Sequence, residues 1–142
     1  MTEDRTETGG ARLVKLSDSN LTLAEPTADA RGRKVLDRQG DEIGHVDDLF
    51  VDEGEGKVRF LRVAAGGFLS LGERHFLVPV DAVTRTDPDT VQVDQTLKHV
   101  TGSPAYDPAL VDRPDYWSGY YGYYGYAPFW GPGYVYPGYP YY

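Results

Sequence analysis

The charged residues of this chain stop at Asp115. All 36 charged side chains (14 Lys and Arg, 22 Asp and Glu) lie in residues 1–115, and residues 116–142 contain none. That final segment holds eleven Tyr, two Trp, six Gly and four Pro in 27 positions. Because glycine and proline oppose regular helices and strands, we expect residues 116–142 to form a disordered, low-complexity aromatic tail. The foldable part of the chain must then precede it.

Short strands are predicted upstream of this tail. From Arg31 to Asp94, apolar runs alternate with turns made mainly of Gly and Asp, such as residues 37–41 and 52–56. Runs of this length between such turns are typical of β-strands. The six predicted strands are Val35–Leu36, Ile43–Val51, Val58–Ala64, Phe76–Val80, Ala82–Thr86 and Val91–Val93. Together they indicate an all-β fold, a small antiparallel β-barrel.

The apolar residues of these strands should form the core. We expect most of it to come from Val35, Ile43, Val46, Leu49, Val51, Leu61, Val63, Val78 and Val83. Residues 1–29 are predicted to be a short, mostly irregular N-terminal arm, and residues 101–115 a linker. Between the barrel and the linker, a single helical turn is expected at residues 94–100, with Asp94 as its N-cap.

One run in this segment is characteristic of a known family. It comprises Gly32, Val35, Asp37, Gly40, Ile43, Gly44, Val46, Asp48, Leu49, Val51 and Asp52 at fixed spacing. Two later blocks, residues 58–63 and 77–83, agree with it. Over roughly residues 30–95 the chain resembles a PRC-barrel domain, a family named after the cytoplasmic part of the photosynthetic reaction-centre H subunit, and we place the domain at residues 30–100. A similar barrel forms the C-terminal half of the bacterial ribosome-maturation factor.

The resemblance implies a role in docking. Members of the family share protein–protein contacts, so the resemblance implies an adaptor and not a catalyst. A barrel near 70 residues buries only about 60% of its unfolded surface and gains stability from partners. We therefore expect a protein partner or a second copy, as in a homo-oligomer.

Composition excludes several other classes. The net charge of −8 disfavours a nucleic-acid surface, which needs clustered Lys and Arg. No apolar run reaches the 18 or more residues of a membrane helix. The chain has no Cys, which suits a reducing compartment, and its polar N-terminal segment lacks the apolar region of a secretory signal. We expect a cytoplasmic protein.

Carboxylates gather in residues 41–56, which contain seven Asp and Glu and no Lys or Arg. Oxygen ligands of this kind suit Ca²⁺ or Mg²⁺, but their spacing does not match a calcium-binding loop. We favour an anionic docking face and name Asp47, Asp48 and Asp52 as candidate interaction residues.

No catalytic or cofactor site is predicted. The three His residues are at positions 45, 75 and 99, too far apart for the spacing of a typical zinc site. The loop from Gly67 to Gly72 has phosphate-loop spacing but ends in Glu-Arg, without the Lys and Ser/Thr that contact phosphate and Mg²⁺. We expect no enzyme, no cofactor, no metal site and no small-molecule substrate.

The aromatic tail is the remaining candidate for interaction. Its rings can stack and form cation–π contacts of about 0.5–1.5 kcal/mol each, and several weak contacts add up by avidity. The candidates are Tyr120, Tyr121, Tyr123, Tyr124, Tyr126 and Trp130. Alternatively, the tail folds back and covers the barrel.

The sequence thus predicts a non-enzymatic adaptor or assembly module with an aromatic tail. A first alternative is a stress-responsive sensor that binds a small ligand or metal. A second is a ribosome- or RNA-associated factor, with Tyr and Trp stacking on bases.

Overall fold

The computed structural model describes residues 12–65 and 74–140. Its strands are β1 (Leu13–Lys15), β2 (Lys34–Leu36), β3 (Glu42–Asp52), β4 (Val58–Ala65), β5 (Arg74–Pro79), β6 (Val83–Thr86) and β7 (Thr90–Val93). Its helices are α1 (Leu97–Thr101) and α2 (Pro114–Tyr124), with single 3₁₀ turns at Leu16–Asp18, Pro26–Ala28, Val80–Ala82 and Pro108–Leu110. The expected loop at Gly67–Gly72 lies outside the described residues.

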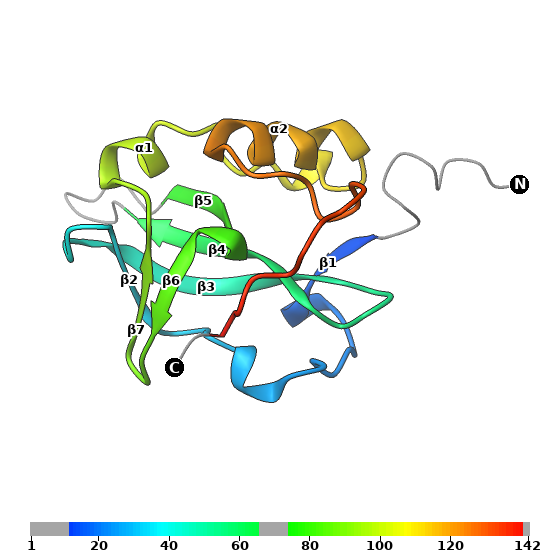
Figure 1. The fold of residues 1–142 in the computed structure, drawn as a ribbon, viewed down its shortest axis with the longest axis horizontal. Helices are drawn as coiled ribbons and strands as arrows, with labels where there is room; N and C mark the ends of the chain where they lie inside the picture. Colours follow the sequence, from blue (N-terminus) through cyan, green and yellow to red (C-terminus); the bar gives the residue numbers. More distant parts are fainter. Residues whose placement is uncertain (1–11, 66–73, 141–142) are drawn as a thin grey trace, which may run out of the picture.

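In the described ranges, seven strands form one sheet in the order β5-β4-β3-β2-β7-β6, with β1 paired to β3. All six predicted strands are present, and β1 is an addition that ties the N-terminal arm to the barrel. Figure 1 shows the sheet curling below the two helices. The expectation of a wholly antiparallel barrel was wrong, because β2 pairs with β7 in parallel, with Val35 opposite Val91. A parallel pair needs a long connection, which residues 37–89 provide.

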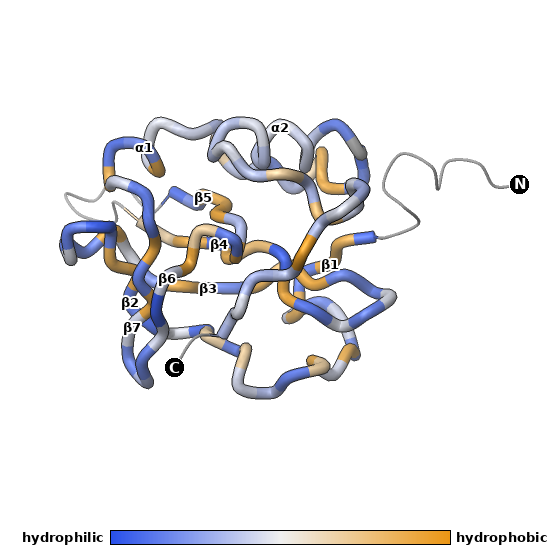
Figure 2. The backbone as a smooth tube through the Cα atoms, viewed as in Figure 1, coloured by the Kyte–Doolittle hydropathy of each residue, from blue (hydrophilic) through white to orange (hydrophobic). Residues whose placement is uncertain are grey.

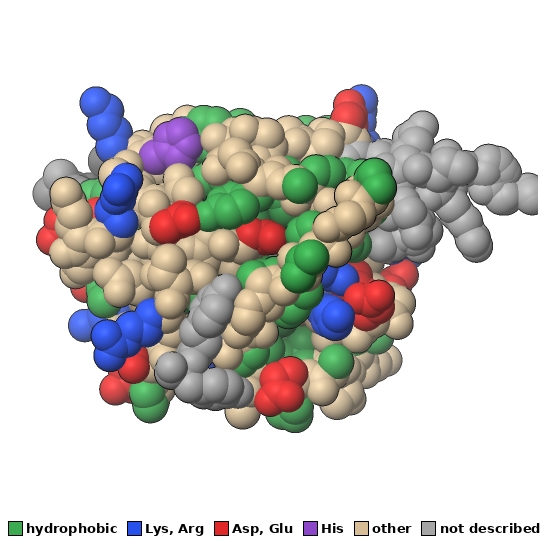
Figure 3. Space-filling view, viewed as in Figure 1, with side chains coloured by type: hydrophobic (Ala, Val, Ile, Leu, Met, Phe, Trp, Pro, Cys, Tyr) green, Lys and Arg blue, Asp and Glu red, His purple; other side chains and the backbone are tan. Residues whose placement is uncertain are grey.

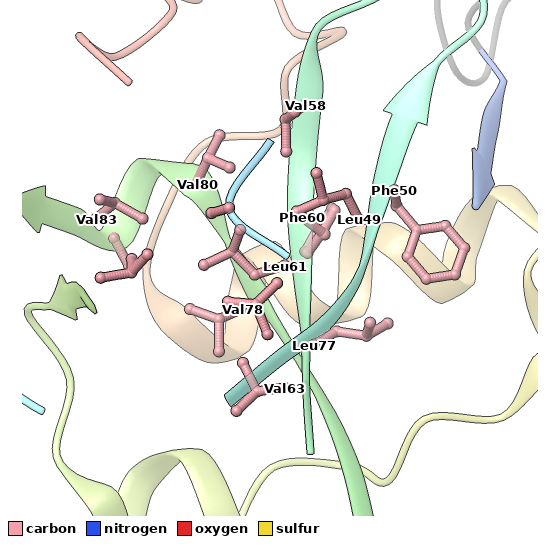
Figure 4. Close-up of a cluster of buried hydrophobic side chains, with 14 of the residues drawn as sticks. Leu49, Phe50, Val58, Phe60, Leu61, Val63, Leu77, Val78, Val80 and Val83 are labelled. Atoms are coloured by element: carbon pink, nitrogen blue, oxygen red, sulfur yellow. The ribbon is translucent and has the colours of Figure 1, made fainter. Parts of the chain in front are cut away.

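The core of the barrel is the one predicted. All nine residues named from the strand pattern are buried, and none exceeds 5% exposure. In Figure 4, Leu61, Val63, Val78 and Val83 converge between β4, β5 and β6. Alternation along β4 turns Phe60 to the opposite face, where it contacts helix α2 instead of the barrel interior.

The aromatic segment is structured, and the prediction of a disordered tail was wrong. Helix α2 begins with Pro114 in its first turn and Asp115 near its N-terminus, both favourable there. It ends where Gly125 adopts a φ of +84° and Tyr126 N donates to the Tyr121 carbonyl at 2.9 Å, a Schellman ending. The domain boundary expected at residue 116 therefore falls inside a helix.

Packing explains why a helix containing glycine forms. Trp117, Tyr120, Tyr121 and Tyr124 recur at helical spacing and are all buried, while Gly119 and Gly122 are exposed on the opposite side. The Trp117 ring lies 5.0 Å from the rings of both Phe50 and Phe60, centroid to centroid. Burial of this aromatic face on the outer surface of β3 and β4 offsets the poor helix propensity of glycine.

The short helix α1 is also present, but with a different cap. Thr96, and not Asp94, is the N-cap: its Oγ1 accepts from the main-chain N–H of His99 at 3.0 Å. Asp94 instead accepts a hydrogen bond from the Tyr126 hydroxyl. The cap chosen from the sequence was therefore wrong by two residues.

Gly44 is a backbone position that only glycine fits. A Cβ on Gly44 would lie 2.0 Å from the carbonyl oxygen of Ala64 and 2.9 Å from its carbon, both main-chain atoms of β4. Because a paired strand cannot move away, we expect Gly44→Ala to lower the free energy of unfolding by at least about 3 kcal/mol. Urea denaturation checks this. The control is Gly122→Ala, where nothing lies within 4 Å and stability should rise by about 0.5–1 kcal/mol. Equal stabilities for the two variants would contradict the close approach.

Candidate docking groove

The predicted aromatic contact residues lie largely inside the protein. Tyr120, Tyr121 and Tyr124 are buried, at 2%, 1% and 6% exposure. The Tyr120 hydroxyl donates to the Pro104 carbonyl at 2.8 Å, and the Tyr121 ring lies 4.9 Å from that of Phe60. These three rings therefore cannot contact another molecule. They form a second hydrophobic core, which lies between α2 and the outer face of the sheet.

The other three aromatic candidates are half-buried and also have partners within the chain. Tyr123 stacks on His99 with ring centroids 4.2 Å apart and donates to its carbonyl at 2.6 Å. Trp130 meets Tyr121 edge to face at 5.8 Å. These contacts join α1, α2 and the segment that follows.

The segment after α2, residues 125–140, crosses the sheet as an extended strap, coloured orange to red in Figure 1. Figure 3 shows hydrophobic side chains along its surface. The Tyr136 hydroxyl donates to the Val58 carbonyl at 2.9 Å, and that of buried Tyr139 donates to the Ala28 carbonyl at 2.6 Å. The guanidinium of Arg59 lies 4.3 Å from the Phe129 ring centroid, within the range of a cation–π contact. The strap is therefore fastened to the barrel.

The three candidate aspartates do not form a common anionic face. Asp47 is paired on the outer face of the sheet, with Arg62 Nε at 2.8 Å and His75 Nε2 at 3.0 Å. Asp48 is buried and bonds Ser17, and Asp52 is buried and paired with Arg59 at 2.7 Å. Each of these carboxylates therefore already has a hydrogen-bond or ion-pair partner within the chain. The buried pairs fix the N-terminal arm and the β3–β4 turn.

Burial also shifts the acidity of several side chains. It raises the pKa of the phenols of Tyr120, Tyr121 and Tyr139, and raises that of Tyr124 to about 12. Desolvation likewise raises the pKa of Asp81, although the Tyr134 hydroxyl donates to its Oδ2 at 2.8 Å. No cluster of three or more His, Asp or Glu side chains suited to a metal ion occurs within residues 12–65 and 74–140.

An open groove lies beside β1 and the end of β3, since Phe50 and Glu53 line it together with Leu13 to Lys15. Its volume is about 620 Å³, and it is lined by β1, by residues 18–21 and by the segment from Tyr106 to Asp112. Phe50 and Tyr106 form part of its floor, with ring centroids 5.8 Å apart. Trp117 of α2 supports the far wall, since its Nε1 donates to the Val111 carbonyl at 2.8 Å. Phe50 and Trp117 thus connect the groove to the aromatic core beneath α2.

Charged residues border this apolar floor. Arg12 lies 3.6 Å from Asp112, and Lys15 lies 3.3 Å from Asp18, so these four charges compensate one another. Glu53 is exposed, and no cation among the described residues forms an ion pair with it. The sequence prediction missed this groove, because the arm was expected to be irregular and residues 101–115 to be a linker.

The fold and the groove define a class of protein: a small, mostly β barrel with an aromatic cover and an open groove beside β1. The chain belongs to the PRC-barrel domain family, which matches residues 26–100. None of the curated proteins is similar enough to count as a match. No helix within the described ranges is long and apolar enough to cross a membrane.

Proposed function

We propose that this PRC-barrel protein is a non-enzymatic adaptor that docks a protein partner in the groove beside β1. The observation that supports this proposal is the groove itself. It combines an apolar floor at Phe50 and Tyr106 with a strand edge and a charged border, and these are features of protein-binding surfaces.

The candidates named from the sequence take different roles in this proposal. The buried tyrosines of α2 and the paired aspartates of β3 build and hold the groove, and the partner contacts β1, Leu21, Tyr106 and Val111. The acidity of the chain, −8 overall, argues against an RNA partner. A second copy of the chain is the homo-oligomeric form of the same function.

A small-ligand sensor is the second candidate function. A volume of about 620 Å³ falls in the range of about 300–1,000 Å³ of small-molecule sites. The groove, however, is open and is lined by three consecutive residues of β1, Leu13 to Lys15, which favours an extended protein segment over a compact ligand.

Site-specific photo-crosslinking in cells tests the docking function. A photoreactive phenylalanine analogue at Val111, a half-buried residue of the groove, should give a crosslinked protein product. The same group at Thr84, exposed on β6 and outside the groove lining, should give at least about tenfold less, because contact here requires a specific interface. A product of twice the chain mass would identify a second copy. Equal yields at both positions, or none at Val111, would refute groove docking.

A further inference from the structure

Some main-chain groups of β1 point sideways, away from β3, as the register of the two strands shows. Glu53 N donates to the Arg12 carbonyl at 2.9 Å, and Asp52 N donates to Lys57 on the other side of β3. Arg12 and Glu53 are therefore a hydrogen-bonded pair. Since such pairs alternate with non-bonded pairs along antiparallel strands, Leu13 opposite Asp52 and Lys15 opposite Phe50 are non-bonded pairs.

Leu13 N–H, Leu13 C=O and Lys15 N–H consequently face away from β3. No hydrogen bond between described residues occupies these three groups. They form a short ladder edge, and unpaired groups of this kind are a template for another strand. Leu13 and Lys15 are also among the residues that line the groove.

We infer that the partner docks by adding a β-strand to β1. Its extended segment would bond the outward main-chain groups of Leu13 and Lys15. One apolar side chain of the segment would rest on the half-buried Tyr106 ring, and a basic side chain would approach Glu53. This inference rests on the proposed docking function and specifies the partner as an extended apolar–basic peptide segment.

Electrostatic repulsion disfavours a second copy of the chain as the occupant of the groove and favours a neutral or basic segment. Glu53 is the border charge without an ion-pair partner among the described residues, and each copy carries a net charge of −8. Pairing β1 with its own copy would bring two Glu53 carboxylates and two acidic molecules together. A neutral or basic strand avoids that repulsion and satisfies Glu53.

Lys15 offers a substitution that blocks strand addition selectively. Its φ of −70° matches the fixed φ of proline, and its N–H faces away from β3. Lys15→Pro therefore removes an outward donor and leaves the β1–β3 ladder intact. Lys15→Ala is the matched control, because it loses the same side chain and the same ion pair with Asp18 but keeps the N–H.

The probe is a labelled, acetylated heptapeptide of alternating valine and threonine with one terminal lysine, and binding is measured by fluorescence anisotropy with the full chain. We expect saturable binding to the parent and to Lys15→Ala, with at least tenfold weaker binding to Lys15→Pro. Glu53→Gln should weaken binding about two- to threefold. Equal binding to the Pro and Ala variants, or no binding to the parent, overturns strand addition.

Crosslinking from Val111 separates this inference from the docking function. If Lys15→Pro still gives the full yield of crosslinked partner, the groove docks a protein by another geometry. If the parent chain gives no crosslink at Val111, both the docking function and strand addition fail. Circular dichroism melts of the two Lys15 variants should coincide within a few degrees, which shows that the Pro variant is folded.

Discussion

A chain that ends at Arg113 should not fold cooperatively. Such a chain lacks α2 and the strap, and it exposes Phe50 and Phe60, which are at most 1% exposed in the whole chain. Each buried aromatic side chain removed from a core costs about 3–5 kcal/mol. Loss of Trp117, Tyr120 and Tyr121 alone therefore approaches the whole net stability of about 5–15 kcal/mol of a typical domain.

Thermal melts followed by circular dichroism check this expectation. A second chain ending at Tyr126 keeps α2 and its Schellman ending but lacks most of the strap. It should fold and melt cooperatively at a lower temperature, because the contacts of Phe129, Tyr136 and Tyr139 are lost. If the chain ending at Arg113 melted like the full chain, the aromatic segment would be a dispensable tail after all.

The barrel could be predicted because its signals are local. Each strand carries apolar residues at period two between Gly or Asp turns, and a one-residue error would turn the whole set to solvent. Alternation along β4 accordingly puts Leu61, a predicted core residue, in the barrel interior and Phe60 on the face toward α2. The parallel pairing of β2 with β7 has no such signal, because it joins strands far apart in the sequence.

The aromatic helix could have been found from spacing. Residues 117, 120, 121 and 124 follow the i, i+3, i+4, i+7 pattern of an amphipathic helix, with Pro114 before them and Gly125 after. The pattern was obscured because tyrosine has low hydropathy, and Figure 2 colours α2 pale although four of its rings are buried. Glycine content disfavours a helix in the sequence, but Gly119 and Gly122 occupy the exposed side of α2, where they interrupt no packing.

The candidate aspartates show why site residues were harder to predict. An acidic run suggests an open anionic face, yet the partners of Asp48 and Asp52 are Ser17 and Arg59, which only the folded chain brings near. The groove was hard to predict for the same reason. It forms where an N-terminal strand meets the segment at residues 106–112, and neither stretch has a periodic pattern that would predict their contact.

Alkaline pH should unfold this protein steeply. An unfolded tyrosine ionises near pH 10, but burial raises the pKa of Tyr120, Tyr121, Tyr124 and Tyr139 in the fold. Below about pH 10 both states keep these protons, so stability is unaffected. Above it, the unfolded state releases protons that the native state retains, and stability falls as pH rises. Each such group contributes about 1.4 kcal/mol per pH unit, or about 5 kcal/mol for four.

The loss should therefore reach about 5–10 kcal/mol between about pH 11 and 12, which is comparable to the typical stability of about 5–15 kcal/mol of a domain. Phenolate absorbance should then rise in step with the loss of circular dichroism. Tyr121→Phe is the informative variant, because among the described residues the Tyr121 hydroxyl is buried without a hydrogen-bond partner. It should leave neutral-pH stability unchanged or slightly raised and reduce the slope by about a quarter. Phenolates that form gradually from about pH 10 in a protein with intact circular dichroism would show that these rings reach solvent in the fold. The second core beneath α2 would then be far looser than the burial of its rings requires.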